Sequence, residues 1–368
     1  MPSCKYCGQV LWGNYINALG ADWHPEHFLC AGCGHPLRDE SFRIVDGQPY
    51  HDACYLTYQA PRCSYCSQPI SGPYQRYEGR SYHNECYREH VGPRCAYCQR
   101  PISGVYQKYE GHSYHSACYR EHVAPRCIYC HKPLLSEYLL DGWGGTYCLE
   151  HQDQYPHCSF CGRLVPPVQQ TPGWDAYGVT RCAICRASSI EAVEQAQPLF
   201  QECKQWIARQ GFRFNQLPLR LELHDRPTLL RMLQGRSINH PLGVTLSSRQ
   251  MRNGHLYTSQ IEGVAMLQGM PPTLFAGVVL HELGHVWLTV HHIEHLPPWA
   301  EEGFCQLLSY RYYSTLNTPE ARYHAERLEH SNDPIYGEGF RKMRALADKM
   351  GFQRFIENLQ TGKRLPGI

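Results

Sequence analysis

The sequence lacks any long hydrophobic run. The longest one, LFAGVVL at residues 274–280, is far shorter than the roughly 20 residues that a membrane-spanning helix needs. The first residues, MPSCKYC, show neither the basic nor the apolar segment of a secretory signal peptide. These absences predict a soluble protein of the cytoplasm.

An excess of charge of one sign is also missing. The chain has 35 Lys+Arg and 33 Asp+Glu, and residues 1–186 contain 16 of each sign. Nucleic-acid binding depends on a basic surface that neutralises phosphates and releases counterions. The balance therefore argues against nucleic acid as a partner and favours protein recognition as the role of this half.

Cysteine is scarce only in the second half, where Cys203 and Cys305 are the two of 20 that follow residue 186. The other eighteen occur as C-x2-C pairs followed at regular distances by H-x2-C, C-x2-H or C-x2-C pairs. This spacing is typical of metal ligands, and it favours zinc over disulfides in a reducing compartment.

Most of these pairs belong to repeats. The segments that begin at Cys63, Cys95 and Cys127 are 32 residues apart, and the first two copies are nearly identical. Each supplies four ligands, and a further unit with the pattern CSFC…RCAIC supplies four more. The predicted quartets are Cys63, Cys66, His83, Cys86; Cys95, Cys98, His115, Cys118; Cys127, Cys130, Cys148, His151; and Cys158, Cys161, Cys182, Cys185.

The first 54 residues carry a denser pattern that resembles a LIM domain, in the segments DWHPEHFLCAGCGHPL and DGQPYHDACY. Two further quartets follow: Cys4, Cys7, His24, His27 and Cys30, Cys33, His51, Cys54. His27 departs from the family pattern, in which cysteine is usual, but histidine also binds zinc. Units of about 30 residues cannot bury enough apolar surface to fold alone, so we expect about six structural zinc ions.

These patterns predict six domains, namely a LIM-like domain with two zinc sites (1–57), three single-zinc LIM-like repeats (58–91, 92–123 and 124–153), a Cys4 zinc knuckle (154–187) and a C-terminal domain (188–368). The fold class is therefore multidomain, with an array of small zinc-stabilised, LIM-like or zinc-ribbon-like β modules ahead of an α+β domain. In the C-terminal domain we expect a helix near residues 190–210 that Pro198 kinks or divides, then a strand at 217–223. A hairpin turning at Asn253-Gly254 and a strand in QIEGVAMLQGM precede a long apolar helix.

That helix contains the motif HELGH. Residues four apart share one helix face, so His281 and His285 can bind one metal ion. Glu282 lies beside them, where it can take a proton from the water that the metal activates. We expect His291, His292 and His295, at the end of the helix, to have no metal role.

A catalytic zinc needs a third protein ligand. The next predicted helix carries Glu301 and Glu302, which point about 100° apart, so only one can face the metal. Here the sequence resembles the gluzincin metallopeptidases, which place a glutamate just before Gly or Ala on a following helix. The resemblance of EEGFC implies a zincin-like fold, Glu302 as the ligand and Glu301 as its neighbour.

The whole order, LIM module first and HELGH…EEGFCQ last, resembles the plant DA1 family of LIM-containing peptidases. The resemblance implies a zinc-dependent peptidase with one catalytic zinc and Glu282 as the catalytic base, acting on a protein that the zinc modules recruit or regulate. Ubiquitin dependence, a property of that family, is doubtful because the sequence shows no ubiquitin-interacting segment ahead of the first zinc ligand. A non-enzymatic adaptor built on the zinc modules is the alternative.

Two finer features stay open in the sequence. The resemblance to zincins suggests that the strand IEGVAMLQGM pairs with an extended substrate. A tyrosine or histidine should stabilise the oxyanion, and the sequence does not choose among Tyr310, Tyr312, Tyr323 and His324.

Overall fold

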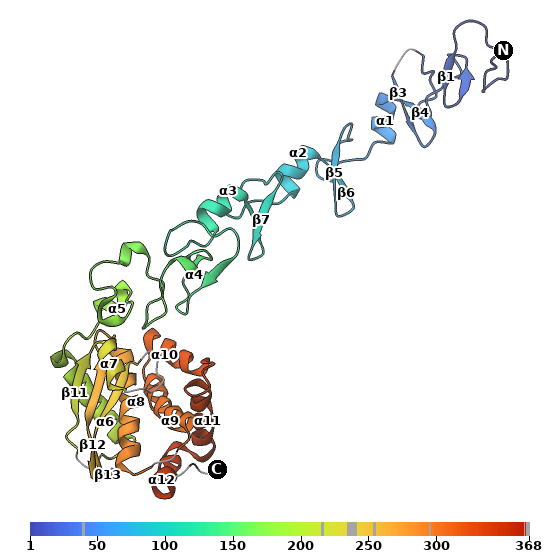
Figure 1. The fold of residues 1–368 in the computed structure, drawn as a ribbon. Helices are drawn as coiled ribbons and strands as arrows, with labels where there is room; N and C mark the ends of the chain where they lie inside the picture. The colour runs from blue at the N-terminus through green and yellow to red at the C-terminus, as the bar shows by residue number, and fades with distance from the viewer. Residues whose placement is uncertain are drawn as a thin grey trace. The chain divides into compact units, whose positions relative to one another are not determined.

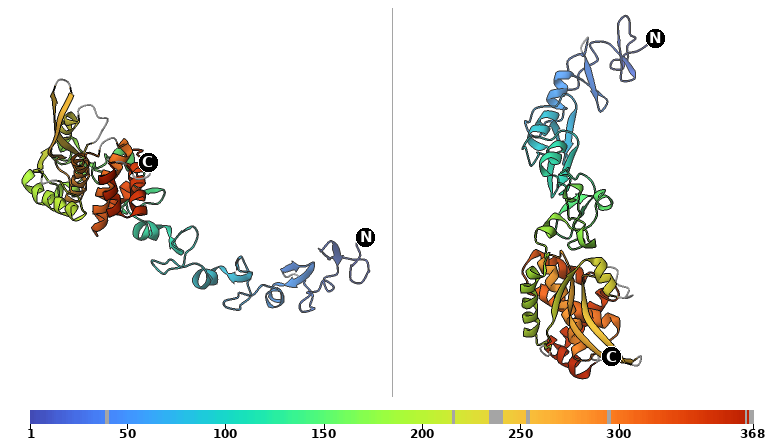
Figure 2. Two further views of the ribbon diagram at one scale, coloured as in Figure 1. Left: turned by 90° about the horizontal axis from the view of Figure 1, so that it is seen from below. Right: turned by 60° about the vertical axis from the view of Figure 1, so that its left-hand side comes forward.

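The computed structural model describes residues 1–38, 41–214, 217–233, 241–252, 255–293, 296–363 and 365. The chain divides into two compact units, Met1–Ala124 and Pro125–Ile368, and each is described by itself. Figure 1 shows the elements of both units, and Figure 2 shows them from two further directions.

The N-terminal unit consists of small antiparallel hairpins. Its described residues form β1 Ile16–Ala18 with β2 Ala21–Trp23, β3 Phe42–Val45 with β4 Gln48–His51, β5 Tyr74–Tyr77 with β6 Arg80–His83, and β7 Tyr106–Tyr109 with β8 His112–His115. The last three hairpins lead directly into short helices. These are α1 Asp52–Tyr58, α2 Asn84–Cys86 and α3 Ser116–Cys118, and the latter two continue as single π-turns, Tyr87–Val91 and Tyr119–Val123.

This strand-to-helix junction explains the spacing H-x2-C. The histidine is the last residue of the strand and the N-cap of the helix, as in His51 before α1 and His83 before α2. The cysteine follows three residues later, within the first helical turn, where it returns to the side of the histidine. A strand end and a helix start thus bring two ligands to one point.

The cores of these modules are very small. One cluster contains Phe28, Leu37 and Tyr50 around Cys30, and another contains Ile70 and Tyr82 around Cys63. Burial on this scale cannot offset the entropy of ordering about 30 residues. The metal ligands at the centre of each cluster must therefore supply much of the stability.

The second unit begins with two more metal-ligand modules. The first contains the hairpin of β9 Tyr138–Leu140 and β10 Thr146–Cys148, followed by α4 His151–Gln154. The second contains two 3-10 turns, Pro167–Gln169 and Ala176–Gly178, and α5 Ala183–Ala187.

The rest of this unit combines one sheet with several helices. The sheet has the order β11-β13-β12, formed by β11 Arg220–His224, β13 His255–Leu267 and β12 Gly243–Arg252. β13 pairs in parallel with β11 and antiparallel with β12. The helices are α6 Val193–Arg209, α7 Arg226–Met232, α8 Pro272–Val290, α9 Pro298–Thr315, α10 Pro319–Glu329, α11 Gly337–Met350 and α12 Phe352–Gly362.

Three sequence-based expectations for this region need correction. Pro198 does not divide α6, which is one helix of 17 residues with Pro198 inside it. The hairpin and the strand in QIEGVAMLQGM are not separate, because one long strand, β13, serves both. β13 is also the central strand, so both of its edges are occupied over residues 263–266 and it cannot pair with a substrate there. The predicted turn at Asn253-Gly254 lies outside the described residues.

The core of the second unit surrounds α8, which lies between the sheet and α9 (Figure 1). α8 is long and apolar enough to cross a membrane, with a mean hydropathy of 1.3 over its most apolar window, but 72% of that window is buried inside the domain. It is therefore the core helix of this domain. The same hydrophobic core extends from Phe160 and Val165 of the Cys4 module to Phe355 and Leu365 near the end of the chain.

A tyrosine of α10 connects the two metal-ligand modules of this unit to its helices. The ring of Tyr323 stacks on Trp143, with centroids 4.5 Å apart, and it lies against Gly142 and Gly162. Trp143 in turn donates from its indole nitrogen to the Cys161 carbonyl oxygen at 2.9 Å. Both modules thus contact the same aromatic side chain.

Candidate active site and zinc modules

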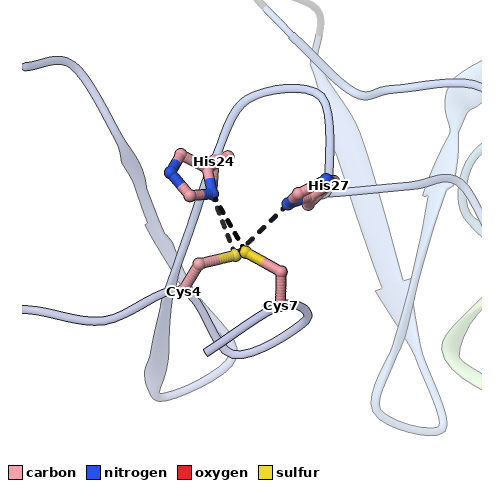
Figure 3. Close-up of side chains that lie close together, drawn as sticks. All are labelled: Cys4, Cys7, His24 and His27. Atoms are coloured by element: carbon pink, nitrogen blue, oxygen red, sulfur yellow. Dashed lines mark hydrogen bonds between the residues drawn. The ribbon is translucent and has the colours of Figure 1, made fainter. Parts of the chain in front are cut away.

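The structure brings together the ligand quartets predicted from the spacing. In five of them, one potential ligand atom from each residue lies within 4.8 Å of all the others. Figure 3 shows the first quartet, in which Cys7 Sγ lies 3.5 Å from His24 Nδ1 and Cys4 Sγ lies 3.6 Å from His27 Nδ1. With zinc bonds of about 2.3 Å to sulfur and about 2.05 Å to nitrogen, neighbouring ligands of a tetrahedral site lie roughly 3.3–3.8 Å apart. The donor set fits zinc, with His27 in place of the usual cysteine.

The histidines of the two near-identical repeats are held by a second contact. His83 Nε2 lies 3.2 Å from the Pro69 carbonyl oxygen, and His115 Nε2 lies 3.1 Å from that of Pro101. A carbonyl can only accept, so Nε2 carries the proton and Nδ1 presents its lone pair to the cysteines. This arrangement fixes the ring in the orientation that a metal needs.

The two quartets of the second unit have the same character. His151 Nε2 is buried without a hydrogen-bond partner among the described residues, while its Nδ1 lies 3.4 Å from Gln154 Oε1. Nε2 is therefore the nitrogen of His151 that is available to bind a metal ion in the Cys127 quartet. In the last quartet Cys161 Sγ lies 3.6 Å from Cys182 Sγ, and the four thiols contact one another.

A different cluster forms between α8 and α9. His281 and His285 lie one turn apart on α8, and their Nε2 atoms are 3.3 Å apart. Glu302 of α9 places Oε2 3.2 Å from His281 Nε2 and 3.5 Å from His285 Nε2. These three separations match the edges of a tetrahedron around zinc, which are about 3.3 Å for bonds of about 2.05 Å. With three protein ligands, a fourth position remains for water or substrate.

The buried polar atoms of this cluster also favour a bound ion. Glu302 Oε2 and His281 Nδ1 are buried and have no hydrogen-bond partner within the described parts of the chain. Burial works to raise the pKa of Glu302, but the contacts with His281 and His285 outweigh it and lower the pKa below its ordinary value. A buried carboxylate that stays ionised beside two imidazoles fits a divalent cation.

The two neighbouring glutamates of α9 meet the histidines from different sides. Glu302 lies within the cluster, whereas Glu301 Oε1 lies 3.0 Å from His285 Nδ1, the ring nitrogen that faces away from it. A carboxylate on the outer nitrogen orients the ring and raises the basicity of the inner one. The structure thus gives the two residues the separate positions that the EEGFC pattern implied.

Glu282 lies beside the cluster and is only 6% exposed. Its Oε2 accepts a hydrogen bond of 2.9 Å from Thr245 Oγ1 of β12. The sequence did not indicate Thr245, because the contact joins residues 37 positions apart.

The four candidates for an oxyanion-stabilising residue are engaged elsewhere. Their contacts are those of Tyr310 with Glu329, Tyr312 with Trp206, Tyr323 with Trp143, and His324 with Tyr313.

Tyr336, which the sequence analysis missed, lies closer to the metal cluster. It immediately precedes α11, and its ring centroid lies 6.5 Å from that of His281. Burial raises the pKa of Tyr336, and the charge of Glu302 raises it further, so the hydroxyl keeps its proton. The only hint in the sequence is the segment NDPIYGEG, a turn leading into a helix.

The remaining residues of the motif region have structural contacts. His291 Nε2 donates to the Arg213 carbonyl oxygen at 3.0 Å just after α8 ends, and His295 lies outside the described residues. Burial raises the pKa of Cys305 to about 12 and that of Cys203 to about 12, so both remain thiols. Cys203 is also buried, with 1% of its surface exposed.

Comparison with known proteins covers both regions. A family model of the LIM domain matches residues 4–59, which hold the first two quartets. A DA1-like model, described as Protein DA1, matches residues 234–322, which hold HELGH and EEGFC. The two family-model matches, together with the relatives, support the DA1-like family with LIM modules.

Members of the DA1-like family from two plants align with almost the whole chain. LIM domain-containing protein HDR3 of Oryza sativa subsp. japonica is 22% identical over 97% of this chain and 72% of its own length. Protein DA1 of Arabidopsis thaliana is 23% identical over 99% of this chain and 68% of its own length. Protein DA1-related 2 of the same plant is 24% identical over 96% of this chain and 67% of its own length. The order of LIM module and C-terminal helical region is therefore shared with this family.

Proposed function

We propose that the chain is a zinc-dependent peptidase. The observation that carries this proposal is the set of three ligand atoms from His281, His285 and Glu302, 3.2–3.5 Å apart, with a buried carboxylate beside them. A zinc ion held there would lower the pKa of a water molecule and polarise the carbonyl group of a peptide bond. Closed Cys/His quartets have no open position, so the chemistry belongs to this site alone.

The chain's own residues have separate roles in the reaction. Glu282 takes a proton from the water that attacks the carbonyl carbon, and it delivers a proton to the amine nitrogen as the C–N bond breaks. Tyr336 directs its phenolic hydroxyl toward the carbonyl oxygen as negative charge develops there. Glu301 holds the imidazole of His285 in place throughout.

An extended substrate would pair with β12. Of the described strands β12 lies at the edge of the sheet, and it carries Thr245, which contacts Glu282. A segment added to this edge would run past the metal ligands with its backbone hydrogen-bonded. This replaces the earlier hypothesis that assigned the role to β13.

We further propose that the zinc modules recruit or regulate a protein substrate in the cytoplasm. The modules of residues 1–124 expose aromatic side chains, among them Trp12 at 76% and Tyr6 at 66%, and residues 1–186 have balanced charge. Aromatic residues without a basic surface suit a protein partner better than nucleic acid. None of the 20 cysteines, all of which lie in the described part of the chain, forms a disulfide, which suits a reducing compartment.

Cleavage of an unfolded protein tests the peptidase proposal. The zinc-loaded chain should degrade unfolded casein, and Glu282→Gln, which keeps size but cannot accept the proton, should slow cleavage about 10²- to 10⁴-fold. Equal cleavage by both forms would contradict the mechanism. Absence of cleavage by either form, with zinc bound and with candidate partners added, would favour the adaptor.

A further inference from the structure

The carboxylate of Glu282 lies in a cradle formed by two residues of β12. Thr245 Oγ1 lies 2.9 Å from Glu282 Oε2, and it also lies 3.2 Å from the Glu282 carbonyl oxygen. Gly243 is two residues earlier and so faces the same way. A Cβ atom at Gly243 would lie 2.8 Å from both Cγ and Oε1 of Glu282, so only glycine leaves room for the carboxylate.

The hydrogen bond from Thr245 restricts side-chain rotations of Glu282 that α8 leaves free. The helix fixes the backbone of Glu282, but three rotatable side-chain bonds lie between the Cα atom and the carboxylate oxygens. A general base must stay within hydrogen-bond reach of the proton it takes, and a shift of about 1 Å can cost roughly 100-fold in rate. A donor from a neighbouring strand supplies the missing constraint.

We propose that Thr245 is a positioning residue for the general base, and that Gly243 provides the space in which the base is held. This inference rests on the proposed peptidase function. The hydroxyl of Thr245 binds Oε2, which holds the carboxylate in one orientation beside His281 and His285. Among the described residues the Thr245 hydroxyl has its hydrogen bonds with Glu282, so its role concerns the base and not the metal ligands.

Two substitutions separate the hydroxyl from the shape of the side chain. Thr245→Val keeps the branched shape and the strand preference but removes the donor, and Thr245→Ser keeps the donor. We expect Thr245→Val to lower kcat roughly tenfold with little change in KM, and Thr245→Ser to restore most of it. Gly243→Ala should lower kcat as well, because its methyl group displaces Glu282. Ser247→Ala, at an exposed position of the same strand, is the matched control and should behave as wild type.

The experiment has a kinetic and a binding arm on the zinc-loaded full chain. The kinetic arm measures kcat and KM for fluorescently labelled unfolded casein. The binding arm measures, by calorimetry, the affinity for a peptide hydroxamate, a zinc-binding probe whose proton is taken up by the general base. Zinc content is measured for every variant. Thr245→Val should weaken hydroxamate binding severalfold, as Glu282→Gln does, while its zinc content stays at the wild-type level.

Three results would overturn the inference. They are wild-type values for Thr245→Val in both arms, values for Thr245→Ser as low as those for Thr245→Val, and loss of zinc from Thr245→Val. The binding arm also separates this inference from the proposed function. If no form cleaves casein, the peptidase proposal fails, while hydroxamate binding that depends on Glu282 and on the Thr245 hydroxyl still supports the positioning role.

Discussion

At the scale of single residues, neighbouring positions have different roles. Glu301 and Glu302 have the same side chain and follow each other in the chain, yet one lies on the outer nitrogen of His285 and the other within the ligand cluster. The roughly 100° turn between adjacent helical residues produces this separation. One carboxylate is thus placed where it could ligate an ion, and the other is placed where it can orient the His285 ring.

Substitution of Glu301 tests this division. We expect Glu301→Ala to weaken zinc binding at the catalytic site about 10- to 100-fold, because the imidazole loses its orienting partner. Glu302→Ala should abolish binding at that site, because it removes a ligand. Competition with a chelator measures both constants. An unchanged affinity in Glu301→Ala would show that its contact with His285 contributes nothing to the site.

At the scale of secondary-structure elements, α9 and α11 approach each other unusually closely. A Cβ atom on Gly303 would lie 2.3 Å from the carbonyl carbon of Gly339, and one on Gly339 would lie 2.1 Å from the carbonyl oxygen of Trp299. Gly303 directly follows Glu302, and Gly339 lies three residues after Tyr336. The close contact therefore holds a metal ligand and the candidate oxyanion residue at a fixed separation.

A methyl group at this contact should force the two helices apart. We expect Gly303→Ala to lower the free energy of unfolding by about 1–3 kcal/mol, the usual cost of overpacking. It should also reduce kcat, because Tyr336 moves away from the site. Removal of the Tyr336 hydroxyl in Tyr336→Phe should reduce kcat for the same reason. Denaturant unfolding and casein cleavage measure the two effects. Ser314→Ala, at an exposed position of α9, is the control, and a Gly303→Ala protein with wild-type stability would contradict the prediction.

The same scale shows what the sequence could predict. Ligands that are close in the chain were predictable, since a C-x2-C turn, an H-x2-C junction and two histidines four apart on a helix are set by local geometry. The α+β combination, the hairpin and α8 also followed from residue patterns. The order of strands did not, because the hydrophobic pattern of β13 shows that it is buried and says nothing about which strand covers each edge. Thr245 and Tyr336 reach the site only through tertiary contacts, and no local pattern marks them.

At the scale of the whole molecule, the two kinds of metal site should behave differently. Six closed quartets of Cys and His should hold zinc tightly, and the three-ligand site with an open position should release it first. We expect seven zinc ions per chain, one of which a chelator removes early together with the cleavage activity. Native mass spectrometry and elemental analysis give the count. Six or fewer tightly held ions, with none that is labile, would contradict this prediction.

The tyrosine at the tip of each C-x-Y-C turn has a consequence for how such a chain can change. The ring of Tyr65 stacks on that of His90, with centroids 4.0 Å apart, and Tyr97 stacks on His122 at 4.2 Å. In these two repeats the tyrosine therefore contacts a residue of its own repeat. In the next repeat the Leu164 amide of the following module donates to the Tyr129 hydroxyl at 3.0 Å instead. A self-contained repeat can be duplicated or deleted in a gene without breaking a contact of this kind with its neighbour, whereas a repeat tied to the next one cannot. Duplication or deletion of either repeat before Pro125 would therefore leave its tyrosine–histidine contact intact, whereas loss of the module after the Tyr129 repeat would remove the partner of Tyr129.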